Sequence, residues 1–402
     1  MRFMFSIEKT FFEVIMYYHT VYMLLAVISP ESSLKNKWAL LFLVCIYLYY
    51  NNRVRRVNRI AFIFNNVFLI GYTLYIALKC GFSQVLHVDY YSYVLLMYVF
   101  LTFSNVDVVM RFKKFLVCYH KKFLISTIMF FSLLLVSILI RNGLRVGQGS
   151  SIPVLYGPYS IPHGLAYSLI GIYCAVSILY NTYHKNFYLI LKGVCILCTI
   201  WTATRSAVLA LAFIIFADYL SIRKPRVKVM LVYIACIAFF YLLFFTDIIT
   251  NNPLVQKTIT AMGTGSITNG RERFAAIVMD YYYNFTTISE KVFGIGMEAV
   301  RGSLKNNPTV NVAIHAHNDY VNALCGYGVC GLLIYIGGQL LALKINKKVW
   351  NKLLLQLFLF ILIYYNGLAM YMVLTPVLLI IYAFFLSAEE NRKKYIKGEC
   401  HE

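Results

Sequence analysis

Residues 164–183 read GLAYSLIGIYCAVSILYNTY, and none of these side chains carries a charge. An apolar run of about 20 residues is what an α-helix needs to cross the hydrocarbon core of a bilayer. Runs of similar length recur along the whole chain. The sequence therefore predicts an all-α, polytopic integral membrane protein.

The composition supports the same fold class. Hydrophobic residues make up 60% of the 402 residues and charged residues 13%. Soluble domains carry about 25% charged residues. A soluble fold of this size has too little interior to bury so much apolar surface, which would remain as large exposed patches. An ordinary soluble protein is excluded.

The basic residues that give a net charge of +21 are gathered in short clusters between apolar runs. The clusters are Arg53, Arg55, Arg56 and Arg59; Arg111, Lys113, Lys114, Lys121 and Lys122; Arg223, Lys224, Arg226 and Lys228; Lys344, Lys347, Lys348 and Lys352; and Arg392, Lys393, Lys394 and Lys397. Short loops rich in Lys and Arg stay on the cytoplasmic side of a membrane. We therefore expect a lipid membrane, and no nucleic acid, as the partner of this chain.

Alternating the sides of the apolar runs gives a consistent topology of about 12 transmembrane helices. The candidate spans are 11–29, 38–52, 60–80, 88–105, 123–141, 164–183, 187–204, 206–222, 229–246, 319–343, 350–366 and 369–388. A cytoplasmic N-terminus then places every basic cluster and the C-terminus in the cytoplasm. The predicted location is the bacterial inner membrane, with both termini inside.

The first span and the cysteines have ordinary structural interpretations. The span 11–29 contains Glu13 and His19 and is followed by no small-residue cleavage site, so we expect it to be retained rather than removed as a signal peptide. Cys195 and Cys198 form a CxxC motif in mid-membrane without a second pair. They are expected to pack helices rather than to bind zinc.

Two long segments fall on the outer side, at about 141–163 and 247–318. The chain thus divides into nine or so spans over 1–246, a large periplasmic loop over 247–318, and about three spans with a basic tail over 319–402. Within the large loop, 274–286 is amphipathic and suited to the membrane surface. Because large ordered loops on a scaffold often build sites, we expect the function to face outward.

Two histidines stand where the large loop meets the next span. The order is His315, His317, Asn318 and Asp319, followed in the span by Gly326, Gly328 and Gly331. Histidine titrates near neutral pH and can accept a proton, and the glycines allow a helix or a lipid chain to approach the backbone closely. Helix capping and packing explain the same residues equally well.

Arginines on the outer side favour function over packing. Arg145 lies in the first outer loop, Arg205 between two spans, and Arg271, Arg273 and Arg301 in the large loop. A charge near the hydrocarbon is costly unless it is paired, and guanidinium groups bind phosphate oxygens bidentately. As a set they predict a site for an anionic, phosphate-bearing lipid headgroup, although each alone also fits a loop-bracing role.

The motifs around these residues resemble the O-antigen ligase and polymerase superfamily. The run His317-Asn318-Asp319-Tyr320-Val321, followed by Gly328 and Gly331, is similar to the family's His-Asn-x-x-Leu … Gly-x-x-Gly signature, with Val321 in place of Leu. Thr204-Arg205-Ser206 resembles its Ser/Thr-Arg-Gly/Ala element. Gly270-Arg271 and the Gly294-x-Gly296 turn also resemble elements at the same positions in the family's large periplasmic loop. The detailed resemblance covers roughly 190–345.

The resemblance implies a glycosyltransferase that uses a glycan on undecaprenyl pyrophosphate at the periplasmic face, without a metal or other cofactor. His317 would be the general base, and Arg205, with Arg271 or Arg273 and also Arg301, would bind the pyrophosphate. His315 is a rival base, and Asn318 and Arg145 are secondary candidates. A chain-length regulator or a flippase would be a further partner. Direct displacement would invert the anomeric centre.

The resemblance leaves polymerase and ligase open. A polymerase extends a lipid-linked repeat unit, whereas a ligase transfers the glycan to lipid A–core. The segment Tyr156 to Gly164 resembles polymerase members more than ligases, and the 34 Tyr and 30 Phe residues agree, so we favour a polymerase. A secondary transporter or flippase is the alternative of another class. No half-to-half similarity is visible, and the candidate residues gather at one face rather than at mid-membrane.

Overall fold

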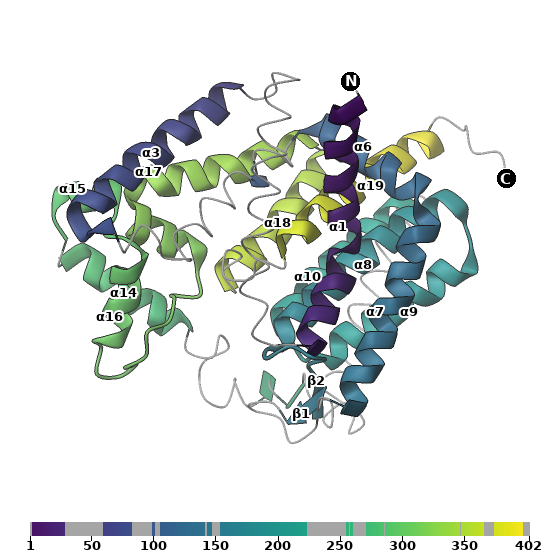
Figure 1. Ribbon diagram of the computed structural model, residues 1–402, viewed down its shortest axis with the longest axis horizontal. Helices are drawn as coiled ribbons and strands as arrows, with labels where there is room; N and C mark the ends of the chain where they lie inside the picture. The colour runs from purple at the N-terminus through teal and green to yellow at the C-terminus, as the bar shows by residue number, and fades with distance from the viewer. Residues whose placement is uncertain are drawn as a thin grey trace.

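The computed structural model describes most of the chain, and the described residues are largely helical (Figure 1). The described residues are 2–28, 59–82, 99–100, 105–140, 143–146, 153–222, 255–256, 258–259, 271–284, 286–345, 347–365 and 374–396. The predicted spans 38–52 and 229–246 and most of 88–105 lie outside these residues. So do Gly270 and the cluster Arg223 to Lys228. The described part is mostly helical, as predicted.

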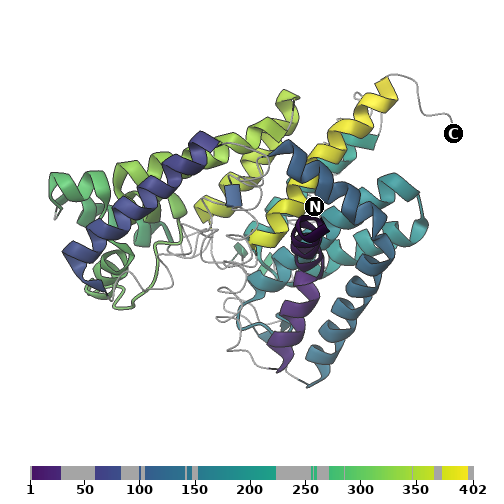
Figure 2. The ribbon, with the colours of Figure 1, turned by 45° about the horizontal axis from the view of Figure 1, so that its top comes forward.

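The helices fall into two groups that lie side by side in both ribbon views (Figures 1 and 2). The larger group, here called the helical bundle, contains α1 (Arg2–Ile28), α6 (Val106–Cys118), α7 (His120–Ile140), α8 (Pro162–Tyr183), α9 (Asn186–Trp201), α10 (Arg205–Ile222), α18 (Val349–Tyr365) and α19 (Leu374–Ile396). The smaller group, here called the loop assembly, contains α3 (Arg59–Cys80), α14 (Arg271–Asn284), α15 (Ile288–Phe293), α16 (Met297–Lys305) and α17 (Asp319–Ala342). A short 3₁₀ turn, η2 (Leu343–Ile345), follows α17.

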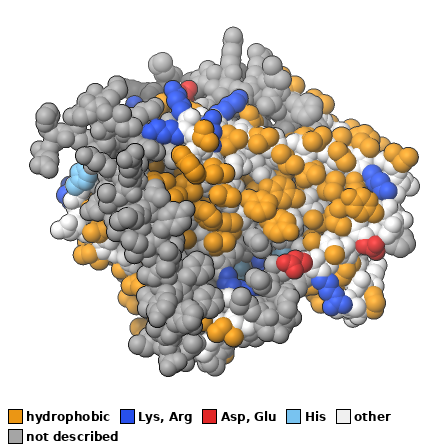
Figure 3. Space-filling model, turned by 180° about the vertical axis from the view of Figure 1, so that it is seen from behind, with side chains coloured by type: hydrophobic (Ala, Val, Ile, Leu, Met, Phe, Trp, Pro, Cys, Tyr) orange, Lys and Arg blue, Asp and Glu red, His pale blue; other side chains and the backbone are white. Residues whose placement is uncertain are grey.

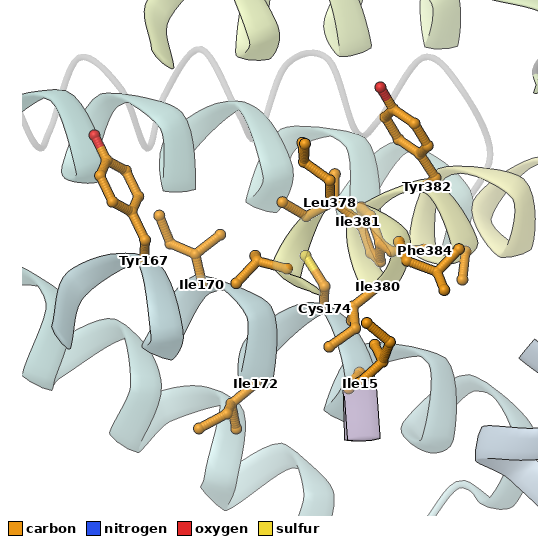
Figure 4. Packing of buried hydrophobic residues seen from close by; sticks show 14 of the residues in the cluster. Ile15, Tyr167, Ile170, Ile172, Cys174, Leu378, Ile380, Ile381, Tyr382 and Phe384 are labelled. Atoms are coloured by element: carbon orange, nitrogen blue, oxygen red, sulfur yellow. The ribbon is translucent and has the colours of Figure 1, made fainter. Parts of the chain in front are cut away.

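The bundle is built around α8, whose side chains are almost all buried from its start to Leu179. Helices α9, α10, α19 and α6 pack against it. Figure 4 shows Ile170 and Cys174 of α8 close to Leu378 and Ile381 of α19. The apolar run 164–183 therefore forms the centre of the bundle, because its all-round hydrophobicity allows packing on every side.

Four helices in the described part of the chain are long and apolar enough to cross a membrane. They are Ile7–Ile28, His120–Ile140, Pro162–Tyr183 and Asp319–Ile345, and three shorter apolar helices cover Asn186–Trp201, Val349–Tyr364 and Val377–Ala388. Hydrophobic side chains spread over much of one face of the molecule, with Lys and Arg towards its margins (Figure 3). The chain is thus membrane-integral, while the full count of twelve spans stays a prediction.

Helix α17, predicted as one span over 319–343, is broken at Gly328. Gly328 has φ 70° and ψ −174°, values that end one helical arm and begin another. A Cβ at Gly331 would lie 2.1 Å from Cβ of Tyr327 and 3.6 Å from the Ala323 carbonyl oxygen. A straight helix separates residues eight positions apart by about 12 Å. The second arm therefore folds back against the first, and the glycines of the signature make this possible.

Two short strands depart from the all-α prediction. Strands β1 (Leu144–Val146) and β2 (Pro153–Leu155) pair antiparallel, with Arg145 opposite Val154. The hairpin follows α7 and precedes α8, in the segment predicted as the first outer loop. A loop of this length needs partners for its backbone groups, and strand pairing supplies them.

Two contacts join helix ends that the predicted topology assigns to the same side of the membrane. At the predicted cytoplasmic side, the Tyr183 hydroxyl donates to the Val117 carbonyl at 3.0 Å. At the opposite ends, the Trp201 indole N–H donates to the Pro153 carbonyl at 3.2 Å. Figure 1 places the start of α1 and the β hairpin at opposite ends of the bundle.

Candidate functional site

Arg205 begins α10 directly after a tight reversal from α9. Ala203 in this turn has φ 48°, which is unusual for a residue with a side chain. The Thr202 hydroxyl donates to the Thr199 carbonyl at 2.7 Å, and the Ala203 N–H donates to the Ile200 carbonyl at 2.9 Å. The strained turn fixes the place at which the Arg205 side chain leaves the backbone.

The β hairpin covers this turn. Val154 of β2 and Ala203 form a small buried cluster, against which Tyr156 and Val208 pack. The guanidinium of Arg145 lies over the Tyr156 ring, 5.5 Å from its centroid. Arg145 therefore belongs to the element that braces the Arg205 turn, and the cation–π contact accounts for part of its placement.

Arg205 and Arg271, predicted separately from two motifs, lie close enough for their charges to interact. Burial lowers the pKa of the Arg205 guanidinium, and the positive charge of Arg271 lowers it further. The two residues begin different helices, α10 and α14. Like charges held close together in a half-buried place repel each other, and an anion bound beside both relieves that repulsion.

His317 lies beside the same end of α14. Its ring centroid is 6.2 Å from that of Phe274, which is one helical turn after Arg271. His317 has φ 54°, a left-handed conformation that turns the chain sharply before α17. The predicted base thus lies beside α14, the helix that begins with Arg271.

The segment that carries His317 is held by two asparagines. The Asn318 side-chain oxygen accepts from the N–H groups of Tyr320 and Val321, at 3.0 and 3.3 Å, and so caps α17. The Asn322 side-chain oxygen accepts from the Ala316 N–H at 3.2 Å. Asn318, a secondary candidate, therefore has a capping role, and Asn322, which the sequence did not single out, fixes the turn before it.

His315, Arg273 and Arg301 have different surroundings. His315 is only 4% exposed, whereas Arg273 is exposed on α14. Arg301 is half-buried on α16, next to Val300, which is fully buried. Among the residues that the structure describes, no three His, Cys, Asp or Glu side chains are grouped as metal ligands.

A small hydrophobic core, here called the loop core, supports the segments that carry Arg271, Arg301 and His317. It consists of Val278, Tyr282, Ile295, Val300, Leu304, Ala316 and Cys325. Ala316 lies directly before His317, Val300 directly before Arg301, and Val278 is on the helix of Arg271. Val278 and Tyr282 of α14 therefore pack against α16 and α17, while the location of 274–286 at the membrane surface stays a prediction.

The Gly294-Ile295-Gly296 turn docks onto the break in α17. The Ile295 N–H donates to the Cys325 carbonyl at 2.9 Å, and the Gly296 N–H donates to the Gly326 carbonyl at 3.1 Å. The Tyr72 hydroxyl of α3 also donates to the Gly326 carbonyl. Two carbonyls next to the break, those of Cys325 and Gly326, are thus satisfied within the protein, as a broken helix in a membrane requires.

Only glycine fits at the closest points of this contact. A Cβ at Gly294 would lie 2.2 Å from the Gly326 carbonyl oxygen, and one at Gly328 would lie 2.2 Å from the Val292 carbonyl oxygen. Both residues also have positive φ, 93° and 70°. The two glycine motifs of the sequence therefore meet each other, which the linear pattern did not reveal.

These observations define the class of the protein: a membrane-integral, mostly helical protein with arginines and a histidine gathered at one end of its helices. Residues 190–336 match the family model described as O-antigen ligase. The match extends from α9 across the α17 break and supports the O-antigen ligase and polymerase superfamily, with a role in glycan transfer. Arg145 and the segment from Tyr156 to Gly164 precede the matched residues. No curated protein matches the chain.

Proposed function

We propose that this protein transfers a glycan from undecaprenyl pyrophosphate to an acceptor hydroxyl at the outer face of the bacterial inner membrane. The proposal is supported by the interaction of the Arg205 and Arg271 charges and by the position of His317 beside Phe274 of the helix that carries Arg271. Two guanidinium groups suit a pyrophosphate, and an imidazole suits a hydroxyl proton. The loop over 247–318 is the periplasmic part, between the spans of 1–246 and those of 319–402.

The proposed reaction is a single displacement. The acceptor oxygen attacks the anomeric carbon while His317 takes the hydroxyl proton. The bond from the anomeric carbon to the pyrophosphate oxygen breaks with its electron pair, and undecaprenyl pyrophosphate leaves as an anion. Arg205 and Arg271 stabilise the charge that develops on that leaving group. Attack opposite the leaving group inverts the anomeric configuration.

The other predicted residues take secondary places in this proposal. Arg301, next to Val300 of the loop core, is a further candidate to bind the pyrophosphate. Arg145, on the β hairpin that packs against the Arg205 turn, stays a secondary candidate for donor contact. Arg273 is exposed and contributes least. His315 is buried, so it is less suited than His317 to meet an acceptor that arrives from water.

A polymerase is favoured over a ligase by the segment from Tyr156 to Gly164. Tyr159 in this segment is buried and stacks on Tyr22, with ring centroids 5.0 Å apart. The segment is therefore an ordered part of the bundle. The phenotype separates the two activities: loss of a polymerase leaves core with a single repeat unit, and loss of a ligase leaves bare core with lipid-linked polymer.

The broken helix α17 is the feature that favours a transporter instead, since discontinuous helices line transport sites. In this protein the carbonyls of Cys325 and Gly326 at the break accept from the Gly294–Gly296 turn and from Tyr72. They are thus used for packing rather than for binding an ion. Elongation of a lipid-linked glycan by purified protein in vesicles, without a transmembrane gradient, distinguishes the enzyme from a transporter.

The direct genetic test replaces His317 with Ala in cells that depend on this protein for surface polysaccharide. We expect the polysaccharide to be lost or shortened to a single unit at a normal protein level. Arg273→Ala, at an exposed position of the same loop, should retain normal polysaccharide. Normal chain length and amount in the His317→Ala cells would rule out the proposed role of this histidine.

A further inference from the structure

The two arms of α17 are joined by two hydrogen bonds that cross the break at Gly328. The Tyr335 hydroxyl donates to Oδ2 of Asp319 at 2.9 Å. The Tyr320 hydroxyl donates to Oε1 of Gln339 at 2.9 Å. Asp319, Tyr335 and Gln339 are all buried. We call these two pairs the arm clasp.

The arm clasp exists only because the helix folds back. In a straight helix, Asp319 and Tyr335 are separated by about 24 Å along the axis. A hydrogen bond to a carboxylate in a low-dielectric surrounding is among the stronger ones in proteins. The clasp therefore fixes the angle between the arms, which the flexible glycine leaves open.

The first arm carries the proposed catalytic segment. Asp319 is the first residue of α17, directly after the capping Asn318 and two residues after His317. Asn322, one turn further along the same arm, holds the Ala316 N–H. Any rotation of the first arm therefore moves the histidine as well.

The second arm is fixed to the bundle through α18. The side-chain amide of Gln356 in α18 donates to the Gln339 carbonyl of the second arm at 3.2 Å. Tyr320 of the first arm also lies near Phe360 of α18, with ring centroids 6.3 Å apart. Helix α18 also packs against α10, which begins with Arg205. The clasp thus connects the arm of His317 to the helix of the proposed pyrophosphate-binding arginine.

We propose that Asp319 and Tyr335 are positioning residues, which set the place of His317 relative to Arg205 by clasping the two arms of α17. The proposal rests on the proposed glycan transfer. In this proposal Asp319 acts indirectly: Oδ2 of its carboxylate accepts from Tyr335 of the second arm, and its effect reaches the reaction through the backbone of Asn318 and His317.

The test replaces Tyr335 with Phe, which keeps the ring and its edge-to-face contact with Phe100 and removes only the hydroxyl. The full-length protein in liposomes is assayed with lipid-linked glycan extracted from cells that lack it. Because a misplacement of about 1 Å can cost roughly 100-fold in rate, we expect kcat to fall roughly 10- to 100-fold. KM for the lipid-linked glycan should stay near the wild-type value, since the arginines remain.

Tyr183→Phe is the matched control. It removes one hydroxyl that donates to a backbone carbonyl at 3.0 Å, at the other end of the bundle, and we expect wild-type kcat and KM. Hydrogen–deuterium exchange gives a second readout: the amides of 314–322 should exchange faster in Tyr335→Phe and unchanged in Tyr183→Phe. Equal kcat and equal exchange in the two variants would overturn the proposal.

Two substitutions of Asp319 distinguish a positioning role from a role of its negative charge. Asp319→Asn keeps an oxygen that accepts from Tyr335, so activity should stay close to wild type, whereas Asp319→Leu should match Tyr335→Phe. An Asn variant as defective as Leu would show that the negative charge matters and would overturn the positioning role. If wild-type protein transfers no glycan, the proposed function itself fails. If it transfers glycan and Tyr335→Phe is unaffected, only the clasp fails.

Discussion

The helical bundle and the loop assembly are held together by different forces. In the bundle, apolar side chains pack on every side of α8, and its neighbours α9, α10 and α19 bury Ile, Leu and Phe against it. In the loop assembly, the decisive contacts are between backbones. Gly294 and Gly328 lie against carbonyl oxygens, and two N–H groups of the turn pair with the broken helix.

The difference explains how each region responds to change. Close-packed side chains tolerate conservative replacement, because neighbours shift slightly and the burial of apolar surface is kept. A backbone contact at a positive φ tolerates almost none, because a new Cβ meets an atom that cannot move away. The proposed active site is mounted on the second kind of contact, which suits a site whose geometry must stay fixed.

The largest effect is expected where the bundle departs from apolar packing. Lys192 of α9 and Asp218 of α10 form a buried ion pair, and the hydroxyls of Tyr173 and Ser177 donate to the same carboxylate at 3.1 and 3.2 Å. Removing one partner leaves an uncompensated buried charge. Lys192→Met should therefore lower the free energy of unfolding by roughly 3–5 kcal/mol, measured by thermal unfolding in detergent.

The double variant Lys192→Met/Asp218→Leu is the control for this pair. Because apolar replacement of both partners removes the buried charges together, it should recover most of the loss. A double variant as unstable as Lys192→Met would show that the bundle depends on this polar network rather than on apolar packing.

The second effect tests the backbone contact of the loop assembly. Gly294→Ala should lower the free energy of unfolding of this region by roughly 2–4 kcal/mol, since it adds a clash with the Gly326 carbonyl to an unfavourable φ. Hydrogen–deuterium exchange at 292–328 measures the change. Gly302→Ala, in α16 where a Cβ meets nothing within 4 Å, should leave exchange unchanged. Equal exchange in both variants would contradict the docking contact.

The third effect compares two arginines of one helix. Arg271→Ala should lower the rate of glycan transfer roughly 100-fold, as expected for loss of one group that stabilises developing charge. Arg273→Ala, at an exposed position, should stay within about twofold. The rates are measured with extracted lipid-linked glycan at equal protein levels. A greater loss for Arg273 than for Arg271 would place the pyrophosphate on the other face of α14.

The smallest effect concerns the contact between α3 and the break. Tyr72→Phe removes a hydroxyl that donates to the Gly326 carbonyl, but that oxygen still accepts from the Gly296 N–H. The free energy of unfolding should therefore fall by only about 1 kcal/mol. A much larger loss in thermal unfolding would mean that Tyr72, rather than the glycine turn, secures the broken helix.

Hydropathy predicted the class of fold, and short motifs supplied the candidate site residues. The run 164–183 is apolar on all sides, so its burial at the centre of the bundle follows from composition. Arg205 and Arg271 each stand in a short motif on the predicted outer side. Their proximity required the tertiary structure, because nothing in the linear sequence relates the start of α10 to the start of α14.

The features that the sequence did not predict depend on long-range contacts. The fold-back of α17 at Gly328 leaves the hydropathy of 319–343 unchanged, so that segment reads as one span. Tyr335 is one of 34 tyrosines in the sequence, and only the folded structure shows that its hydroxyl donates to Asp319. The β hairpin is too short, at three residues a strand, to show a clear alternating pattern.

The role of His317 as the general base is tested by comparing glycan transfer by purified His317→Asn and His184→Asn protein. Both histidines have a left-handed backbone, with φ 54° and 51°, a conformation that Asn tolerates. The two changes are thus alike in backbone cost and differ in place, since His184 ends α8 on the predicted cytoplasmic side. We predict that His317→Asn loses transfer of lipid-linked glycan by roughly 100-fold or more, while His184→Asn keeps the wild-type rate. Equal rates in the two variants would contradict the proposed role of His317 as the general base.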